Sequence, residues 1–216
     1  MDTDRTPAPA PAPAPELRGH GLRLCTWDVE RDDHVEAWWH GQRDPEFKRW
    51  NTPLVFVTDM DSSRDSLRRW AERTADGEGV AFRVADAASG TTLGQISVSA
   101  VNRTTRSAIV GYWVLPEARG HGVATRALRL MARWALADFG LHRLELGHAV
   151  GHEVSCRVAE KCGFRYEGTL RGAMFEAGRR DAFRDMHLHA RLTTDPEPNP
   201  NPAPNPAPNT DPEQTP

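Results

Sequence analysis

The chain has 216 residues and a formal net charge of −3 at pH 7, and its length suits one globular domain. No run of 18 apolar residues occurs, which excludes a transmembrane helix, and the N-terminus lacks the apolar core of a signal peptide. The three cysteines (Cys25, Cys156 and Cys162) form an odd, scattered set, which excludes a disulfide framework. These features predict a cytoplasmic protein.

Both ends of the chain are rich in proline. Fourteen of the 17 prolines lie in residues 1–16 and 193–216, where repeats such as PAPAPAPAP cannot form helices or sheet ladders. The few apolar residues there cannot offset the entropy of ordering the chain. We therefore predict a disordered tail over 1–16, a folded domain over 17–192 and a second disordered tail over 193–216.

Charge is divided unevenly between these parts. The tails carry net charges of −2 and −4, so the 17–192 core carries +3. That mild positive balance suits a small anionic ligand and is too weak to indicate nucleic acid as a partner. A membrane partner is not expected either.

Hydrophobic periodicity divides the core into strands and helices. Strands are predicted where apolar residues alternate or run between turns, and helices where they recur every three or four residues. In chain order we expect a strand at 21–29, helical segments at 31–43 and 59–76, strands at 80–86, 92–101 and 107–115, a helix at 122–138, a strand at 142–150, a helix at 152–162, and strands at 164–172 and 183–192. This order predicts an α/β fold, a mixed sheet with helices against its faces.

The stretch 116–125, PEARGHGVAT, joins the 107–115 strand to the 122–138 helix. The first backbone N–H groups of a helix have no partner inside it, and the helix dipole places partial positive charge there. Glycine removes the Cβ atoms that would keep a bulky anion from the backbone. The turn is therefore a candidate phosphate site, with a plain strand-to-helix connection as the alternative.

Two standard nucleotide loops fit this turn poorly. A P-loop requires Gly-Lys followed by Ser or Thr where Val123, Ala124 and Thr125 stand, and the GxGxxG pattern requires glycine in place of Thr125. The turn also follows an antiparallel meander, whereas a dinucleotide loop opens a parallel unit.

Two motifs resemble those of the GNAT-type N-acetyltransferases. Arg119, Gly122 and Ala124 occupy the fixed positions of the acetyl-CoA loop, (Q/R)-x-x-G-x-(G/A). Downstream, SCRVAEKCGF (155–164) is similar to the N-x-x-S-x-x-V-x-E-K-x-G-F segment of RimJ/RimL-like members, and the earlier DPEFKRW resembles their N-terminal segment. The resemblance covers about residues 20–192.

The resemblance implies a sheet whose central fourth and fifth strands splay apart and admit acetyl-CoA, the acyl donor. Backbone groups of Trp113, Val114 and Leu115 are then expected to hydrogen-bond the pantetheine arm. A backbone N–H near Val114 would stabilise the oxyanion as the amine attacks. The pyrophosphate is expected at the turn after Arg119, held by the N–H groups of Gly120, His121, Gly122, Val123 and Ala124 and by the Thr125 hydroxyl.

The leaving thiolate requires a proton or a hydrogen bond. Many GNAT enzymes supply it from a tyrosine at the position of Ala159 here, whereas RimJ/RimL-like members carry a serine at the position of Ser155. The resemblance therefore implies Ser155 as catalytic donor, with a hydroxyl bonded to its own helix backbone as the alternative. His152 stands where relatives have an asparagine that contacts the pantetheine arm, and we expect it to keep that contact.

The resemblance also implies a catalytic base that takes a proton from the acceptor amine, and two residues are candidates for it. Relatives place a carboxylate near Met174, so Glu176, two residues further, is the first candidate, and Glu145 is its rival. Either could instead be a solvated surface carboxylate. No covalent enzyme intermediate is implied, so Cys156 and Cys162 are expected to be small apolar packing residues.

Several histidines and tryptophans lie outside these motifs. His148 and His152 have helical i,i+4 spacing but straddle a strand end and a helix start, and no acidic or cysteine set completes a site, so we expect no metal. Trp38, Trp39 and Trp70 are expected in the core and pocket wall, and Trp50 is expected to line the acceptor slot.

The resemblance implies acetyl transfer to a primary amine, with protein N-termini, including those of ribosomal proteins, as the acceptor class. Small amines such as polyamines or aminoglycosides are an alternative. Another is a succinyl-CoA-type donor, whose carboxylate could pair with the arginines at 171, 179, 180 and 184. A non-catalytic CoA-binding scaffold is the alternative of another class. The oligomeric state stays open, with a homodimer as one candidate.

Overall fold

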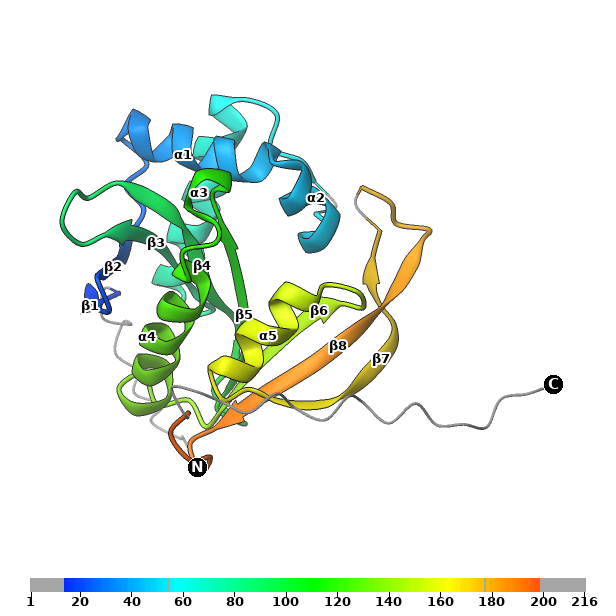
Figure 1. Ribbon diagram of the computed structural model, residues 1–216. Coiled ribbons are helices and arrows are strands. Elements are labelled where there is room, and N and C mark those ends of the chain that lie inside the picture. Colours follow the sequence, from blue (N-terminus) through cyan, green and yellow to red (C-terminus); the bar gives the residue numbers. More distant parts are fainter. Residues whose placement is uncertain (1–13, 54, 177, 199–216) are drawn as a thin grey trace, which may run out of the picture.

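The computed structural model describes residues 14–53, 55–176 and 178–198, which form one mixed sheet covered by helices (Figure 1). The strands of this sheet are β1 (Leu17–Gly19), β2 (Leu22–Thr26), β3 (Val80–Asp86), β4 (Thr92–Asn102), β5 (Ser107–Val114), β6 (Arg143–Ala149), β7 (Arg165–Phe175) and β8 (Phe183–Leu192). Their order across the sheet is β1-β2-β3-β4-β5-β6-β8-β7. Among the pairs recorded in these segments, β5 and β6 are parallel and the others are antiparallel. The predicted α/β fold class is confirmed.

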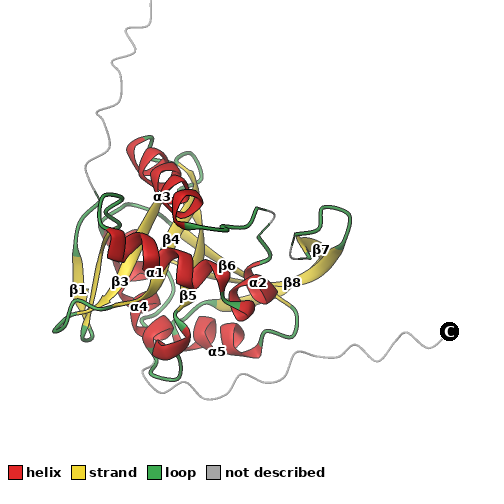
Figure 2. Ribbon diagram, turned by 90° about the horizontal axis from the view of Figure 1, so that it is seen from above, coloured by secondary structure: helices red, strands yellow, loops and turns green. Residues whose placement is uncertain are grey.

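The helices cover both faces of the sheet. They are α1 (Asp32–Arg43), α2 (Pro45–Asn51), α3 (Met60–Ala75), α4 (Val123–Ala137) and α5 (Glu153–Lys161). In the view from above, α4 and α5 lie on one side of the strands and α3 lies on the other, while α1 and α2 cross one end of the sheet (Figure 2). None of the described helices is long and apolar enough to span a bilayer.

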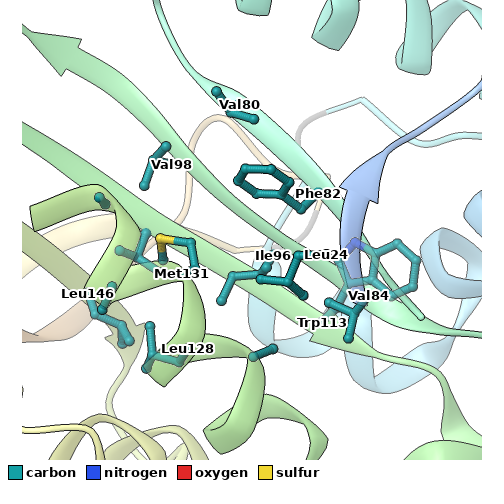
Figure 3. Packing of buried hydrophobic residues seen from close by; sticks show 14 of the residues in the cluster. Leu24, Val80, Phe82, Val84, Ile96, Val98, Trp113, Leu128, Met131 and Leu146 are labelled. Carbon is teal, nitrogen blue, oxygen red and sulfur yellow. The ribbon is translucent and has the colours of Figure 1, made fainter. Parts of the chain in front are cut away.

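The core lies between α4 and the sheet. Leu128 and Met131 of α4 are fully buried and face Leu24 and Ile96 of the central strands (Figure 3). The three- and four-residue spacing that predicted this helix therefore marks its buried face. Burial of each such side chain contributes about 1.5–3 kcal/mol, so α4 is held firmly against the strands that precede it.

The sheet opens between its two parallel strands. Pairing of β5 with β6 runs from Ser107 opposite Arg143 to Val110 opposite Leu146, and in the described chain no pairing is recorded beyond that point. The last four residues of β5, 111–114, therefore continue with β4 as their partner on one side only. This is the splay of the central strands that the sequence predicted.

Three features differ from the expected elements. β2 ends at Thr26 rather than at 29, and β1 precedes it in a segment with no predicted strand. The DPEFKRW segment forms α2, in which Pro45 stands at the first helical position and the Asp44 side chain accepts from the Phe47 N–H at 2.9 Å.

The folded part also extends past the predicted boundary at 192. Thr193 donates its N–H to the His142 carbonyl at 3.0 Å, and Glu197 pairs with Arg191 at 3.3 Å. Residues 1–13 and 199–216, which hold most of the two predicted disordered tails, lie outside the described residues.

Candidate functional site

A cavity of about 440 Å³ lies where the two parallel strands separate. Its wall is formed by α2, the end of β5, the glycine turn and the first turns of α4 and α5. The lining residues are Glu46, Phe47, Trp50, Asn51, Tyr112, Trp113, Val114, Ala118, Arg119, Gly120, Gly122, Val123, Ala124, Thr125, His152, Val154, Ser155 and Val158. The structure thus brings most of the predicted cofactor-binding residues to one cavity.

The glycine turn presents bare backbone to this cavity. Gly120 and Gly122 have φ values of +79° and +68°, and a Cβ at either position would meet no atom within 4 Å. Glycine is therefore required by the left-handed backbone rather than by crowding. α4 begins at Val123 without a side-chain cap, so its first N–H groups are open to a ligand.

His121 is the one member of the predicted pyrophosphate set, Gly120 to Thr125, that does not line the cavity. Its carbonyl accepts from Arg126 Nη2 at 3.3 Å. Its predicted contact through the backbone N–H stays a prediction.

Arg119 holds the turn against the neighbouring helix. Its guanidinium forms an ion pair with the buried carboxylate of Asp44, and its Nε donates to the Val114 carbonyl at 3.1 Å. Asp44 also caps α2, so a single side chain joins that helix to the glycine turn. These contacts give Arg119 a positioning role, and its side chain also lines the cavity.

Backbone direction along β5 decides which residues face the gap. The backbone groups of Leu115 and Trp113 face β4. The Leu115 N–H donates to the Leu93 carbonyl at 2.9 Å, and the Trp113 carbonyl oxygen would lie 2.3 Å from a Cβ on Gly94 of that strand. Because successive residues of a strand direct their backbone groups to opposite sides, the Val114 N–H points toward β6, into the gap. Trp113 and Leu115 direct their backbone groups toward β4 instead, and their expected contacts with the pantetheine arm stay a prediction.

Ser155 faces the cavity and bonds a tyrosine. Its Oγ lies 2.8 Å from the Tyr112 hydroxyl, so its recorded side-chain partner is Tyr112 and not its own helix backbone. Burial raises the pKa of Tyr112 to about 12, and the phenol therefore keeps its proton at neutral pH. If the phenol donates to Ser155, the serine proton is free for an acceptor in the cavity.

Tyr112 is a site residue that the motif comparison missed. It lies on β5, whereas the family position for a tyrosine is Ala159 on α5. Its position could have been predicted from strand spacing. Tyr112 is two residues before Val114, so the two side chains lie on the same face of β5.

His152 stacks on Trp50 at the mouth of the cavity. The ring centroids lie 4.4 Å apart at an angle of 5°, and Trp50 Nε1 donates to Glu46 at 2.8 Å. Burial lowers the pKa of His152 to about 4, so the ring is neutral at pH 7. A neutral imidazole donates one hydrogen bond, as the asparagine of the family motif does.

A second, smaller cavity of about 190 Å³ adjoins the first. The two share part of their lining, Trp50, Asn51, Tyr112, His152 and Ser155. Val110, Gly111, Leu146, Gly147, His148 and Met174 complete the smaller one. The Ser155 and Tyr112 hydroxyls thus stand where two separate spaces meet.

Neither predicted base carboxylate lines either of the two cavities described above. Glu176 follows the last residue of β7 and is not among the lining residues, although Met174 is. Glu145 lies on the paired part of β6 and bonds Arg143 at 2.8 Å. Their role as base stays a prediction.

The cysteines lie in unequal surroundings. Cys162 is fully buried in the core, as a packing residue is expected to be. Cys156 instead lies 3.6 Å from His189 Nε2, and His148, His189 and Cys156 bring three donor atoms within 4.8 Å of one another. This corrects the inference that no cysteine completes a histidine set.

Comparison with known proteins agrees with this geometry. The model of the acetyltransferase (GNAT) domain matches residues 22–165. The chain is 31% identical over 129 residues to YdaF of Bacillus subtilis, provisionally named a ribosomal N-acetyltransferase, covering 57% of this chain and 69% of that one. It is 30% identical over 100 residues to the ribosomal-protein-serine acetyltransferase of Escherichia coli, covering 46% of this chain and 54% of that one.

Solved structures show the same fold. Mycobacterium smegmatis RimJ in complex with CoA-disulfide superposes with a TM-score of 0.71 at 23% identity, covering 84% of this chain and 88% of that one. The family match includes the splayed strands, the glycine turn and the serine of α5. The chain therefore belongs to the GNAT acetyltransferase family and is an acetyl-CoA-dependent N-acetyltransferase.

Proposed function

We propose that this enzyme acetylates the α-amino group of a protein N-terminus by direct attack on acetyl-CoA in a ternary complex. The observation that carries the proposal is the meeting of two cavities at Ser155 and Tyr112. The larger one suits the donor and the smaller one the amine, so the thioester and its attacker come together at the hydroxyl pair.

The donor is held mainly by backbone groups. The pyrophosphate fits the turn at Gly120 and Gly122, where the first N–H groups of α4 and its dipole favour an anion. The pantetheine arm then runs along the unpaired edge of β5. In that position the Val114 N–H donates to the thioester oxygen and stabilises the negative charge that develops as the amine attacks.

The hydroxyl pair supplies the proton for the leaving thiolate. The attacking nitrogen forms a bond to the acetyl carbon, the C–S bond breaks, and sulfur receives a hydrogen bond or proton from Ser155. Tyr112 donates in turn to Ser155, because its phenol is protonated at neutral pH. The amine loses its proton to solvent, and solvent returns one proton to the hydroxyl pair, which restores Ser155 and Tyr112.

The wall chemistry favours an α-amine over a lysine side chain. Among the described residues that line the two cavities the only carboxylate is Glu46, which already accepts from Trp50 Nε1. An α-amino group has a pKa of about 7.7–8.0, so a useful fraction is neutral without a strong base. A lysine amine, with a pKa of about 10.4, requires one.

The relatives support the same acceptor class. The two proteins compared above are named for ribosomal proteins, and the E. coli enzyme for serine in one of them. The succinyl-type alternative has less support, because Arg184 already bonds the Arg49 carbonyl at 2.5 Å and Arg179 pairs with Asp181 at 3.3 Å.

The test is thiol release from acetyl-CoA with matched acceptors. Ribosomal-protein N-terminal peptides should react, while the same peptides with a blocked N-terminus and an internal lysine should not. Polyamines, an aminoglycoside and succinyl-CoA complete the panel. Equal rates on the blocked peptide, or turnover confined to a small amine, would overturn the protein N-terminus as the acceptor.

A further inference from the structure

A cluster of three donor atoms, from two buried histidines and a half-buried cysteine, lies beside the smaller cavity. It consists of His148 on β6, His189 on β8 and Cys156 on α5, and the two histidines are 3% and 0% exposed. The two Nε2 atoms lie 3.3 Å apart, and Cys156 Sγ lies 3.6 Å from His189 Nε2. The acetyl transfer described above uses none of these three atoms.

The hydrogen bonds of the two rings orient their lone pairs toward each other. His148 Nδ1 lies 3.1 Å from the Ala149 carbonyl, and His189 Nδ1 lies 3.3 Å from the Phe164 carbonyl. A carbonyl oxygen only accepts, so each Nδ1 carries the hydrogen and each Nε2 of a neutral ring is an acceptor. The Cys156 thiol lies 3.7 Å from Glu160 Oε1 and 3.6 Å from His189 Nε2, so its single proton can satisfy at most one of the two Nε2 atoms. A cation between the rings satisfies both.

The spacing of the donors is that of a tetrahedral zinc site. Zn–N bonds of about 2.0–2.1 Å and Zn–S bonds of about 2.3 Å at tetrahedral angles give N···N and N···S edges of about 3.3 and 3.6 Å. These are the two edges observed here. The three ligand atoms all lie within 4.8 Å, and rotation about the Cys156 Cα–Cβ bond can adjust the third edge.

The hydrogen bonds of the two imidazole rings also have the arrangement that is common in zinc sites. A histidine that binds a metal through one ring nitrogen generally donates the other N–H to a carbonyl or carboxylate, which fixes its tautomer and orientation. Both histidines do so here, to the carbonyls of the last residue of β6 and of the residue before β7.

We propose that His148, His189 and Cys156 form a zinc-binding site that joins β6, β8 and α5. Three protein ligands leave a fourth position for water or another small ligand. His148 also lines the smaller cavity, so the ion would brace the wall of the acceptor space from behind. Zinc binding would tie the start of α5, which carries Ser155, to the two strands beside it.

The first experiment measures zinc binding directly. Full-length, tag-free enzyme is dialysed against a chelator, then titrated with Zn²⁺ by calorimetry, with metal content determined after gel filtration. We expect about one ion per chain and a rise in Tm on binding, because a ligand specific for the folded state stabilises it. Replacement by Co²⁺ should give a sulfur-to-cobalt charge-transfer band with the strong d–d absorption of a tetrahedral ion. Absence of saturable binding by the wild-type enzyme would overturn the proposal.

Matched variants identify the ligands. Cys156→Ser and His189→Gln should each weaken zinc binding by more than about tenfold, since even the loss of a hydrogen bond to a ligand reaches that size. Cys156→Ser should also abolish the charge-transfer band. Cys25→Ser and His142→Gln, which change the same residue types away from the cluster, should leave both unchanged. Equal binding by Cys156→Ser, or loss of binding in the control variants, would contradict this ligand set, and the cobalt spectrum of the wild type decides the matter even if a variant fails to fold.

Discussion

The donor side and the acceptor side of the site are built in different ways. Most of the donor side is continuous in sequence: the end of β5, the glycine turn and the start of α4 follow one another, and α2 and α5 complete its wall. Its ligand groups are backbone N–H groups, placed by two glycines with positive φ. The acceptor side is assembled from residues of α2, β5, β6, β7 and the start of α5, which are distant in sequence.

This difference bears on how each side tolerates change. A site made of backbone N–H groups tolerates replacement of most side chains around it and depends on a few glycines. A short motif is therefore sufficient for its binding function. A wall of side chains can be rebuilt residue by residue to admit another amine. The donor is therefore common to the family, while the acceptor is the property of an individual enzyme.

The sharpest way to break the donor side is to fill the cradle. Gly122→Trp should lower acetyl-CoA affinity by more than about 100-fold. The turn forces a left-handed φ on the bulky tryptophan, and the indole occupies the place of the pyrophosphate. The affinity is measured by calorimetry on the purified enzyme.

Gly140→Trp is the matched control for Gly122→Trp. Gly140 has a φ of +82°, and a Cβ there also meets no atom within 4 Å, but it follows the far end of α4. Both variants should lose a similar amount of stability, about 1–2 kcal/mol of backbone strain, and only Gly122→Trp should lose CoA binding. Equal affinities for CoA would refute the phosphate site.

The hydroxyl pair at the junction gives the second largest effect. Ser155→Ala should lower kcat by about 100-fold with little change in CoA affinity, because it removes a donor that acts on the leaving sulfur. Tyr112→Phe should lower kcat less, and the double variant should be no worse than Ser155→Ala if the two hydroxyls act as one relay.

Ser97→Ala controls for the loss of a buried serine hydroxyl, since Ser97 is buried on β4 and bonds the Gly111 carbonyl at 3.3 Å. Additive losses in the double variant would contradict the relay. An unchanged kcat for Ser155→Ala would remove Ser155 from the mechanism.

The sequence predicted the donor side far better than the acceptor side, for the same structural reason. Positive-φ glycines and a strand-turn-helix order are local properties, so Gly120, Gly122 and the start of α4 could be read directly. Which backbone groups of Trp113, Val114 and Leu115 face the gap depends on strand register, which local sequence does not contain. The contacts expected of these three residues therefore stay a prediction.

Contacts between distant segments were missed altogether. Cys156 meets His189 across 33 positions, and Tyr112 meets Ser155 across 43. Nothing in the spacing of either pair indicates contact, because the sheet order β6-β8-β7 and the place of α5 above the gap bring them together. A motif on α5 could suggest that Ser155 matters, but not which hydroxyl supports it.

One ion pair links the two sides. Asp44 is 7% exposed, caps α2 and pairs with Arg119 of the glycine turn. Asp44→Asn keeps an acceptor for the cap but removes the charge, and should cost about 1–3 kcal/mol of unfolding free energy. Because both α2 and the turn shift, KM should rise for both substrates, by about tenfold.

Asp32→Asn is the control for Asp44→Asn. It removes an ion pair with Arg64 in which Asp32 is 84% exposed, and it should change stability and both KM values little. A rise in only one KM for Asp44→Asn would show that the two sides respond separately.

The smallest expected effect is the contribution of His152 to the pH dependence of stability, which can be measured separately from activity. The folded pKa of His152 is about 4, below its ordinary value of about 6.5, so between these values the unfolded chain takes up a proton that the folded enzyme does not. Stability is therefore lost as pH falls through this range and is fully present above it. The full shift corresponds to about 2 kcal/mol at pH 5. Because the ring is only partly buried, screening by solvent reduces the expected loss to about 1 kcal/mol.

The variant His152→Asn, which restores the family residue, tests this. Its Tm should fall less between pH 7.5 and pH 5 than the Tm of the wild type, by roughly 2–4 °C per kcal/mol. Its activity near pH 7.5 should be retained, since the wild-type ring is already neutral. An identical fall in Tm for both proteins would show that His152 is no more buried than in the unfolded chain.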